Sequence, residues 1–150
     1  MRPAALDAAL HLIRATPGYI EVAVDLAQLA SDGGLRVHEG LEDRAHAGLL
    51  GTITLGPEAA QASPLSLAET LIHEHYHLRH QHPLQKTVSF WSGVLSHTPV
   101  MRRYEQPAYQ AAVDFLEAVK EVHPHLAQEA AEEQRAVRQV FALSYGGALD

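Results

Sequence analysis

The first hydrophobic pattern in the chain is helical. Over residues 4–15 apolar side chains recur three and four positions apart, at Leu6, Ala9, Leu10 and Ile13, and Pro17-Gly18 ends the pattern. From Tyr19 to Asp25 apolar and polar residues alternate, which predicts a half-buried strand, although the apolar run continues to Ala30 and part of it is compatible with a helix. A second short strand is expected from Leu35 to His38.

The middle of the chain predicts a strand followed by a long helix. Leu49 to Leu55 is rich in residues that favour strands. Ser63 has the properties of a helix N-cap, and Pro64 suits the first helical position because its missing N–H costs nothing there. This helix should run to about Gln81, since Pro83 disfavours helical geometry in the residue before it.

The remaining segments are mostly helical in pattern. Residues 84–97 are ambiguous, whereas 107–122 and 125–143 carry apolar positions at helical spacing. The tail after residue 143 is expected to fray. The economical picture is an α+β fold, a mostly helical domain with a small, largely antiparallel sheet before the long helix. Residues 1–150 are expected to form one domain.

Composition narrows the function classes. The formal net charge is −7, and the eleven Lys and Arg residues are scattered, which argues against nucleic acid as the main ligand. The chain has no cysteine, so a metal would have to be held by His, Asp or Glu. No segment has the apolar length of a membrane span, and a cytoplasmic protein is expected. Of eleven histidines, five fall within ten residues: His73, His75, His77, His80 and His82.

The histidine cluster contains the pattern H-E-x-x-H at residues 73–77. On a helix, positions four apart differ by only about 40° around the axis, so His73 and His77 can direct two ring nitrogens to one ion. Glu74 lies beside them, within reach of a water at the metal without being a ligand. The pattern predicts one zinc ion per chain, with Glu74 as the general base.

The neighbouring residues are expected to have other roles. His75 projects among leucines and is interpreted as a core or boundary histidine with a hydrogen-bond partner, and His82 as a solvated residue. His80 lies one turn beyond His77 on the same helix face. It is expected to be either an additional ligand or a residue that contacts a ligand without binding the metal. Glu69 precedes His73 by one turn, and it either accepts the spare ring N–H of a ligand histidine or is solvated.

A catalytic zinc site generally has three protein ligands. The continuation H-E-x-x-H-x-x-G-x-x-H is absent, because His80 and Pro83 stand where Gly and His are required. Glu105 is the best candidate, since extending the 107–122 helix back by one turn places it on the buried stripe, where a carboxylate is costly unless a cation or several hydrogen bonds meet it. If Pro107 starts the helix, Glu105 is instead a residue favoured by the helix dipole. His97 is the alternative ligand.

These residues together resemble a family. A strand, a loop, a helix with His-Glu-His-Tyr-His and a downstream E-x-x-A at Glu105 look like the gluzincin branch of the zincin metallopeptidases. Compact single-domain proteins of the ImmA/IrrE type are the nearest, over about residues 50–116. The resemblance implies a zincin-like fold, His73, His77 and Glu105 as ligands, Glu74 as base, and the strand Leu49–Leu55 as the edge along which an extended substrate pairs.

The function hypothesis is therefore a zinc-dependent metallopeptidase, an endopeptidase acting on a protein or peptide substrate. Its oxyanion donor would be Tyr104, Tyr109 or His97. The small size is compatible with a homo-oligomer or a regulatory protein partner. Two alternatives remain: a non-catalytic His-rich metal-binding protein and a degenerate zincin fold that serves as a binding module. Glu74 separates them, since neither alternative requires a carboxylate that is not a ligand.

Overall fold

The chain begins with a pair of helices. In the computed structural model, which describes residues 4–41, 45–48, 51–81 and 99–150, α1 spans Ala4–Arg14 and α2 spans Ile20–Ser31. The four apolar residues predicted for the first helix are its buried face. The predicted strand over Tyr19–Asp25 is wrong. In α2, Ala23 and Leu26 are buried at helical spacing, whereas the residues that produced the alternation, Ile20 and Val24, are each 54% exposed.

A small mixed sheet follows. Its strands are β1 (Leu35–Val37), β2 (Ala45–Ala47) and β3 (Ile53–Leu55), in the order β1-β3-β2. The β2–β3 pair is antiparallel, but β1 pairs with β3 in parallel, so the expectation of a largely antiparallel sheet is wrong for that pair. A hydrogen bond from Gly48 N to Thr52 O, at 2.7 Å, connects the end of β2 to the start of β3. β1 therefore pairs with the opposite edge of β3.

The central position of β3 overturns a second expectation. The strand predicted over Leu49–Leu55 was assigned as a free edge for substrate, yet β3 is paired on both sides. It is also shorter than predicted within the described residues, and Leu49 and Leu50 lie outside them. Ile53 and Leu55 are fully buried, so this strand belongs to the core.

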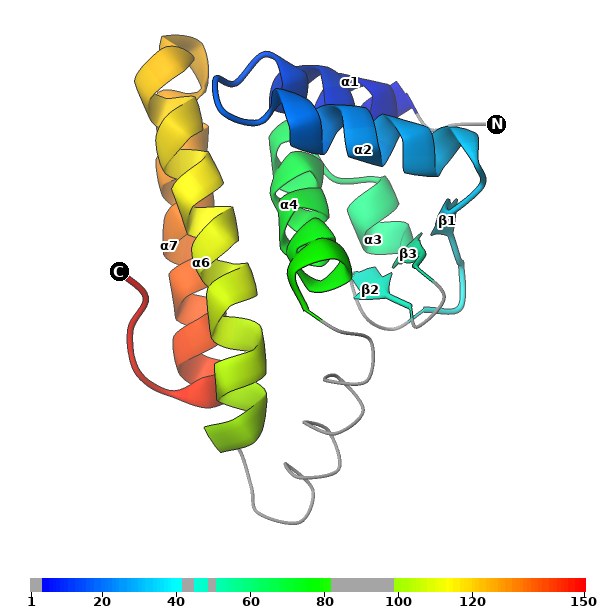
Figure 1. Cartoon of the computed structure of the whole chain (residues 1–150). Helices are drawn as coiled ribbons and strands as arrows, with labels where there is room; N and C mark the ends of the chain where they lie inside the picture. The colour runs from blue at the N-terminus through cyan, green and yellow to red at the C-terminus, as the bar shows by residue number, and fades with distance from the viewer. Residues whose placement is uncertain (1–3, 42–44, 49–50, 82–98) are drawn as a thin grey trace.

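The long central helix has the predicted bounds. After the short helix α3 (Pro57–Ala60), α4 spans Pro64–His80 with Gln81 as C-cap. The Ser63 hydroxyl accepts a hydrogen bond from Ser66 N at 3.2 Å, as expected of an N-cap, and Pro64 is in the first turn. Figure 1 shows α4 between the sheet on one side and a helical hairpin on the other, with α1 and α2 across its first half.

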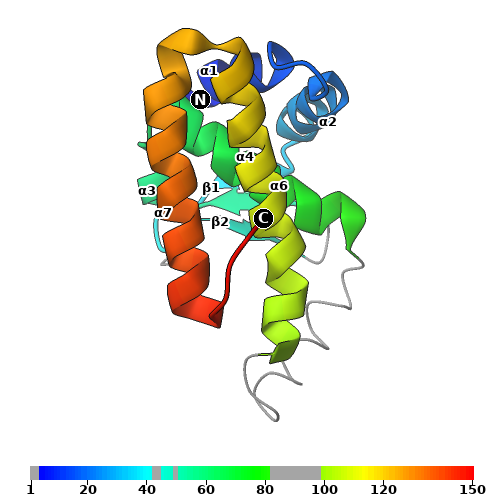
Figure 2. The same ribbon diagram turned by 90° about the vertical axis from the view of Figure 1, so that its left-hand side faces the viewer.

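That hairpin is formed by α6 (Pro99–Val122) and α7 (Ala127–Tyr145), joined by the 3-10 turn η1 (Pro124–Leu126). The two helices lie side by side in both views (Figures 1 and 2). Pro107 lies inside α6 and does not start it. The helix continues through Pro107 because a stripe of buried residues runs along both sides of the proline. Tyr104 is 3% exposed, and Ala108 and Ala112, one and two turns further on, are fully buried.

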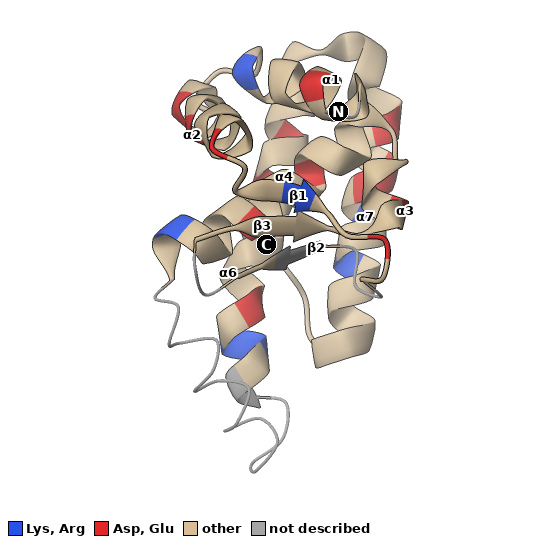
Figure 3. Cartoon of the chain, turned by 90° about the vertical axis from the view of Figure 1, so that its right-hand side faces the viewer, with Lys and Arg blue, Asp and Glu red and all other residues tan. Residues whose placement is uncertain are grey.

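The chain end is also docked. The expected fraying after residue 143 is wrong, because α7 continues to Tyr145 and Leu149 is buried. Asp150 N donates to Gln110 Oε1 at 2.9 Å. The fold is α+β and mostly helical, as predicted. No helix among the described residues has the length and apolarity needed to cross a membrane. In Figure 3 the Lys and Arg positions lie on several different elements.

Candidate metal centre

The two histidines of the motif converge, as their spacing on α4 predicts. The Nε2 atoms of His73 and His77 are 3.2 Å apart, and the two rings meet edge to face. The helix is held in this orientation by a continuous buried run from Leu65 to Ile72. His77 is 8% exposed and His73 is half-buried, so both face the interior of the molecule.

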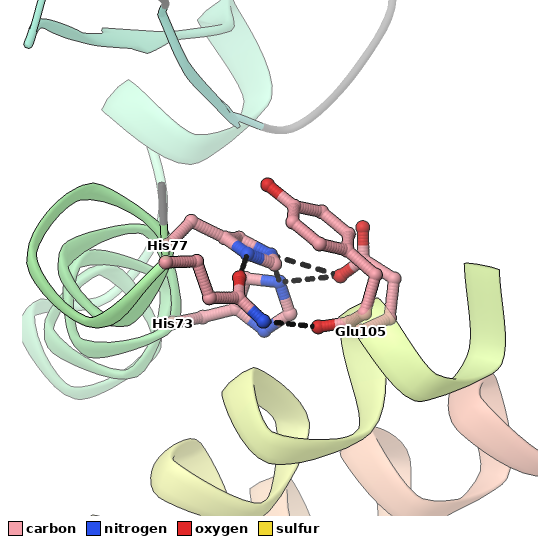
Figure 4. Close-up of polar contacts among 5 residues, drawn as sticks. His73, His77 and Glu105 are labelled. Carbon is pink, nitrogen blue, oxygen red and sulfur yellow. Dashed lines mark hydrogen bonds and ion pairs between the residues drawn. The ribbon is translucent and has the colours of Figure 1, made fainter. Parts of the chain in front are cut away.

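Glu105 of α6 completes the group. Its Oε2 atom lies 2.9 Å from His77 Nε2 and 3.3 Å from His73 Nε2 (Figure 4). Glu105 lies inside α6, because this helix begins before Pro107 and continues through it. The alternative in which Glu105 precedes the helix is wrong.

These distances fit a metal ion. In a tetrahedral site with bonds of 2.0–2.1 Å, ligand atoms lie about 3.3 Å from one another. The three pairwise distances here are 2.9, 3.2 and 3.3 Å. The donor set, two imidazole nitrogens and one carboxylate oxygen, suits zinc and other first-row metals. Among the described residues, His73, His77 and Glu105 are the group close enough to hold a metal ion.

The electrostatics of the metal-free group show how strongly its members interact. Burial alone would raise the pKa of Glu105, but hydrogen bonds with His73 and His77 outweigh it and lower the pKa to about 2. Burial also acts to lower the pKa of His73, yet the hydrogen bond to Glu105 and the charges of Glu105, Glu74 and Glu69 raise it. The carboxylates thus create a site that favours a positive charge.

Glu74 occupies a different environment from Glu105. It is 8% exposed, and no hydrogen bond to its carboxylate occurs within the described residues. Its charge acts on His73, Tyr104 and Tyr109, so the carboxylate is near the metal centre. Its oxygen atoms are not among the fully enclosed unpaired polar atoms of the described residues, so the carboxylate is open to water or a ligand.

Glu69 is buried at 9% exposure, so the interpretation of a solvated residue is wrong. It accepts a hydrogen bond from Thr70 Oγ1 at 3.4 Å, and its charge raises the pKa of His73. Its predicted contact with a ligand histidine stays a prediction.

Two tyrosines flank His73 and His77. The Tyr104 ring stacks on His77 with centroids 4.6 Å apart, and the Tyr109 ring meets His73 edge-on at 4.6 Å. Burial, reinforced by nearby carboxylates, raises the pKa of both phenols, so both keep their proton at neutral pH. Both are thus brought to the centre, whereas His97, the alternative ligand and donor, lies outside the described residues.

The surplus histidines turn away from the centre. His75 Nε2 lies 2.8 Å from Asp25 Oδ2, which confirms the expected hydrogen-bond partner. His80 is exposed and stacks on Tyr76, so it is not a ligand of this group. His82 lies outside the described residues.

Sequence reasoning missed Gln81, which was read only as the end of the helix. Its Oε1 lies 2.5 Å from His77 Nδ1, and its Nε2 donates to Tyr104 O at 2.7 Å. The available signal was its spacing, since it follows His77 by four positions and shares its helix face.

Comparison of the chain with models of known protein families, with characterised proteins and with solved structures found no match. The geometry of the site therefore carries the functional argument.

Proposed function

We propose that this chain is a zinc-dependent metallopeptidase of the gluzincin type. His73, His77 and Glu105 would hold one zinc ion, and Glu74 would be the general base. The observation that carries the proposal is the convergence of three ligand atoms at the spacing of a zinc site. Glu74, a buried carboxylate without a hydrogen bond among the described residues, accompanies them.

The residues divide the work of peptide hydrolysis. Zinc, when bound, would supply Lewis acidity, which lowers the pKa of a bound water to about 7 and polarises the substrate carbonyl. Glu74 accepts the proton of the attacking water and delivers it to the leaving amine. The rings of Tyr104 and Tyr109 pack against the two histidines, and either phenol would serve as the donor that stabilises the oxyanion.

Two features favour a catalytic site over a metal-buffering segment. Only two of the described histidines in the cluster face the centre, since His75 is paired with Asp25 and His80 stacks on Tyr76. A buffer would also gain nothing from Glu74, which the distances do not place among the ligands.

Metal analysis combined with Glu74→Gln tests the proposal. The wild-type chain and the variant should each hold about one zinc ion. The variant should cleave a quenched-fluorescent peptide library at least about 100-fold more slowly, because it lacks the base. Glu21→Gln, an exposed change on α2, serves as the matched control and should retain full activity.

Other outcomes would contradict the proposal. A wild-type chain that holds no zinc, or several loosely bound ions, has no site of this kind. Undiminished cleavage by Glu74→Gln would show that the activity comes from another group or another protein.

A further inference from the structure

Gln81 connects a ligand histidine to the helix that carries the third ligand. It ends α4 in extended geometry, at φ −130 and ψ 139. From there its side chain reaches His77 Nδ1 with one amide atom and Tyr104 O with the other. Tyr104 directly precedes Glu105 on α6.

The second contact fixes the orientation of the amide. Tyr104 O is a main-chain carbonyl, which can only accept a hydrogen bond. The amide nitrogen of Gln81 must therefore face Tyr104 O, at 2.7 Å, and the amide oxygen must face His77 Nδ1. Exchanging the two atoms would set oxygen against oxygen.

The orientation of Gln81 in turn fixes the proton of His77. Because the amide oxygen only accepts, Nδ1 must carry the hydrogen, and a neutral imidazole then has its lone pair on Nε2. That Nε2 faces Glu105 Oε2 at 2.9 Å and His73 Nε2 at 3.2 Å. Without a metal ion, the hydrogen bond to Glu105 needs a second proton, on Nε2. Once a metal ion displaces that proton, the Nε2 lone pair faces the ion, as ligand binding requires, while Gln81 keeps the hydrogen on Nδ1.

We propose that Gln81 is a positioning residue of the metal centre. It holds His77 in the Nδ1–H form and ties the end of α4 to α6 beside Glu105. This inference rests on the metal binding that the proposed function requires, but not on catalysis. A neutral amide differs from the carboxylate that often supports a ligand histidine, since it adds no negative charge to the site.

A purely structural role can be separated by a matched pair. Arg79 also fastens the last turn of α4 to a neighbouring helix, through two hydrogen bonds to Asp25 of α2. Neither partner is among the ligand group. If fastening the helix end were sufficient, losing Arg79 would weaken metal binding as much as losing Gln81.

The experiment measures zinc affinity by competition with a chromophoric chelator in four full-length proteins: wild type, Gln81→Met, Gln81→Glu and Arg79→Met. Gln81→Met should bind zinc about 10–100-fold more weakly, the usual loss for a partner of a ligand histidine. Gln81→Glu should recover part of this loss, since its carboxylate accepts the same Nδ1 proton but cannot donate to Tyr104 O. Arg79→Met should retain wild-type affinity.

A second readout follows the proton itself. Nitrogen NMR of the zinc-loaded proteins should show a protected Nδ1 proton on His77 in wild type and Gln81→Glu. In Gln81→Met the same proton should exchange rapidly with water. Wild-type affinity and protection in Gln81→Met, or an equal loss of affinity in Arg79→Met, would overturn the proposal.

The outcomes separate this inference from the proposed function. A wild-type chain without zinc overturns both. Zinc binding that is insensitive to Gln81 overturns only the positioning role. Weakened binding in Gln81→Met, together with full cleavage by Glu74→Gln, overturns the catalytic assignment and leaves the role of Gln81 standing.

Discussion

His75 and His77 lie two residues apart on α4, and therefore about 200° apart around the helix. The His75 ring meets Asp25, whose carboxylate also binds Arg79 at 2.7 and 2.9 Å. The His77 ring meets Glu105 and a second histidine. The same residue type in one helix is thus placed in two different settings.

The two settings differ in their supply of positive charge. Arg79 is already bound to Asp25, and its hydrogen bonds lower the pKa of that carboxyl. Glu105 has no arginine or lysine partner in the described part of the chain, and both of its ion pairs are to histidines. The Asp25 side is electrostatically complete with its own residues, whereas the Glu105 side could be completed by a metal ion, for which its three ligand atoms lie close enough. This difference, more than the histidines themselves, distinguishes the structural cluster from the proposed metal centre.

The largest expected effect is a loss of zinc affinity through a change on the His77 face of α4 alone. His77→Ala removes a proposed ligand and should weaken zinc binding by more than about 100-fold, beyond the loss expected for a residue that contacts a ligand but not the metal. His75→Ala, the same change two positions earlier, should leave the affinity close to wild type. Chelator competition on both variants checks this. Equal losses would mean that the two sides of α4 do not have separate roles.

The next effect breaks the structural side. Asp25→Ala leaves the ring of His75, which is 8% exposed, without its partner and should cost about 1–3 kcal/mol of unfolding free energy. Asp32→Ala, an exposed change just after the same helix, should cost less than about 0.5 kcal/mol. Urea unfolding of the metal-free proteins measures both. A change in zinc affinity with Asp25→Ala would contradict the separation.

His73 and His75 should change the pH dependence of the unfolding free energy in opposite directions. Burial lowers the pKa of His75 from 6.5 despite Asp25, whereas the interactions with Glu105 raise that of His73 against the effect of burial. The contribution of His75 is therefore present above pH 6.5 and lost as the pH falls through its folded pKa. That of His73 is present below pH 6.5 and lost as the pH rises through its folded pKa.

Urea unfolding of metal-free His73→Ala and His75→Ala, at a series of pH values around neutrality, tests these signs. Relative to wild type, His73→Ala should remove a loss of stability above pH 6.5, and His75→Ala should remove a loss below it. Shifts in the same direction would contradict the assignment.

The sequence predicted those parts of the site that depend on local geometry. His73, Glu74 and His77 follow from helical spacing, and the start of α4 follows from the Ser63-Pro64 pair. Glu105 could be predicted because it lies on the same helix stripe as the buried residues of α6. The packing of that stripe keeps the chain helical through Pro107.

The parts that depend on distant partners were missed. The contact between Asp25 and His75 spans 50 positions, and the sequence around Asp25 suggested a strand. β2 and the parallel pairing of β1 were missed because a strand of three residues carries little periodicity, and its partner is chosen by the folded chain. Gln81 had the right spacing, but its role depends on the main-chain carbonyl of Tyr104, which no pattern of side chains reveals.

The smallest expected effect concerns Arg79. Its side chain is 45% exposed and that of Asp25 is 34% exposed, so the ion pair is screened by water and Arg79→Met should cost at most about 1 kcal/mol of unfolding free energy. Asp25 then retains His75, and the histidine stays paired. The unfolding midpoint in urea should move less than in Asp25→Ala, and added salt should reduce the difference from wild type. A loss as large as that of Asp25→Ala would mean that Arg79, and not the histidine, is the main partner of Asp25.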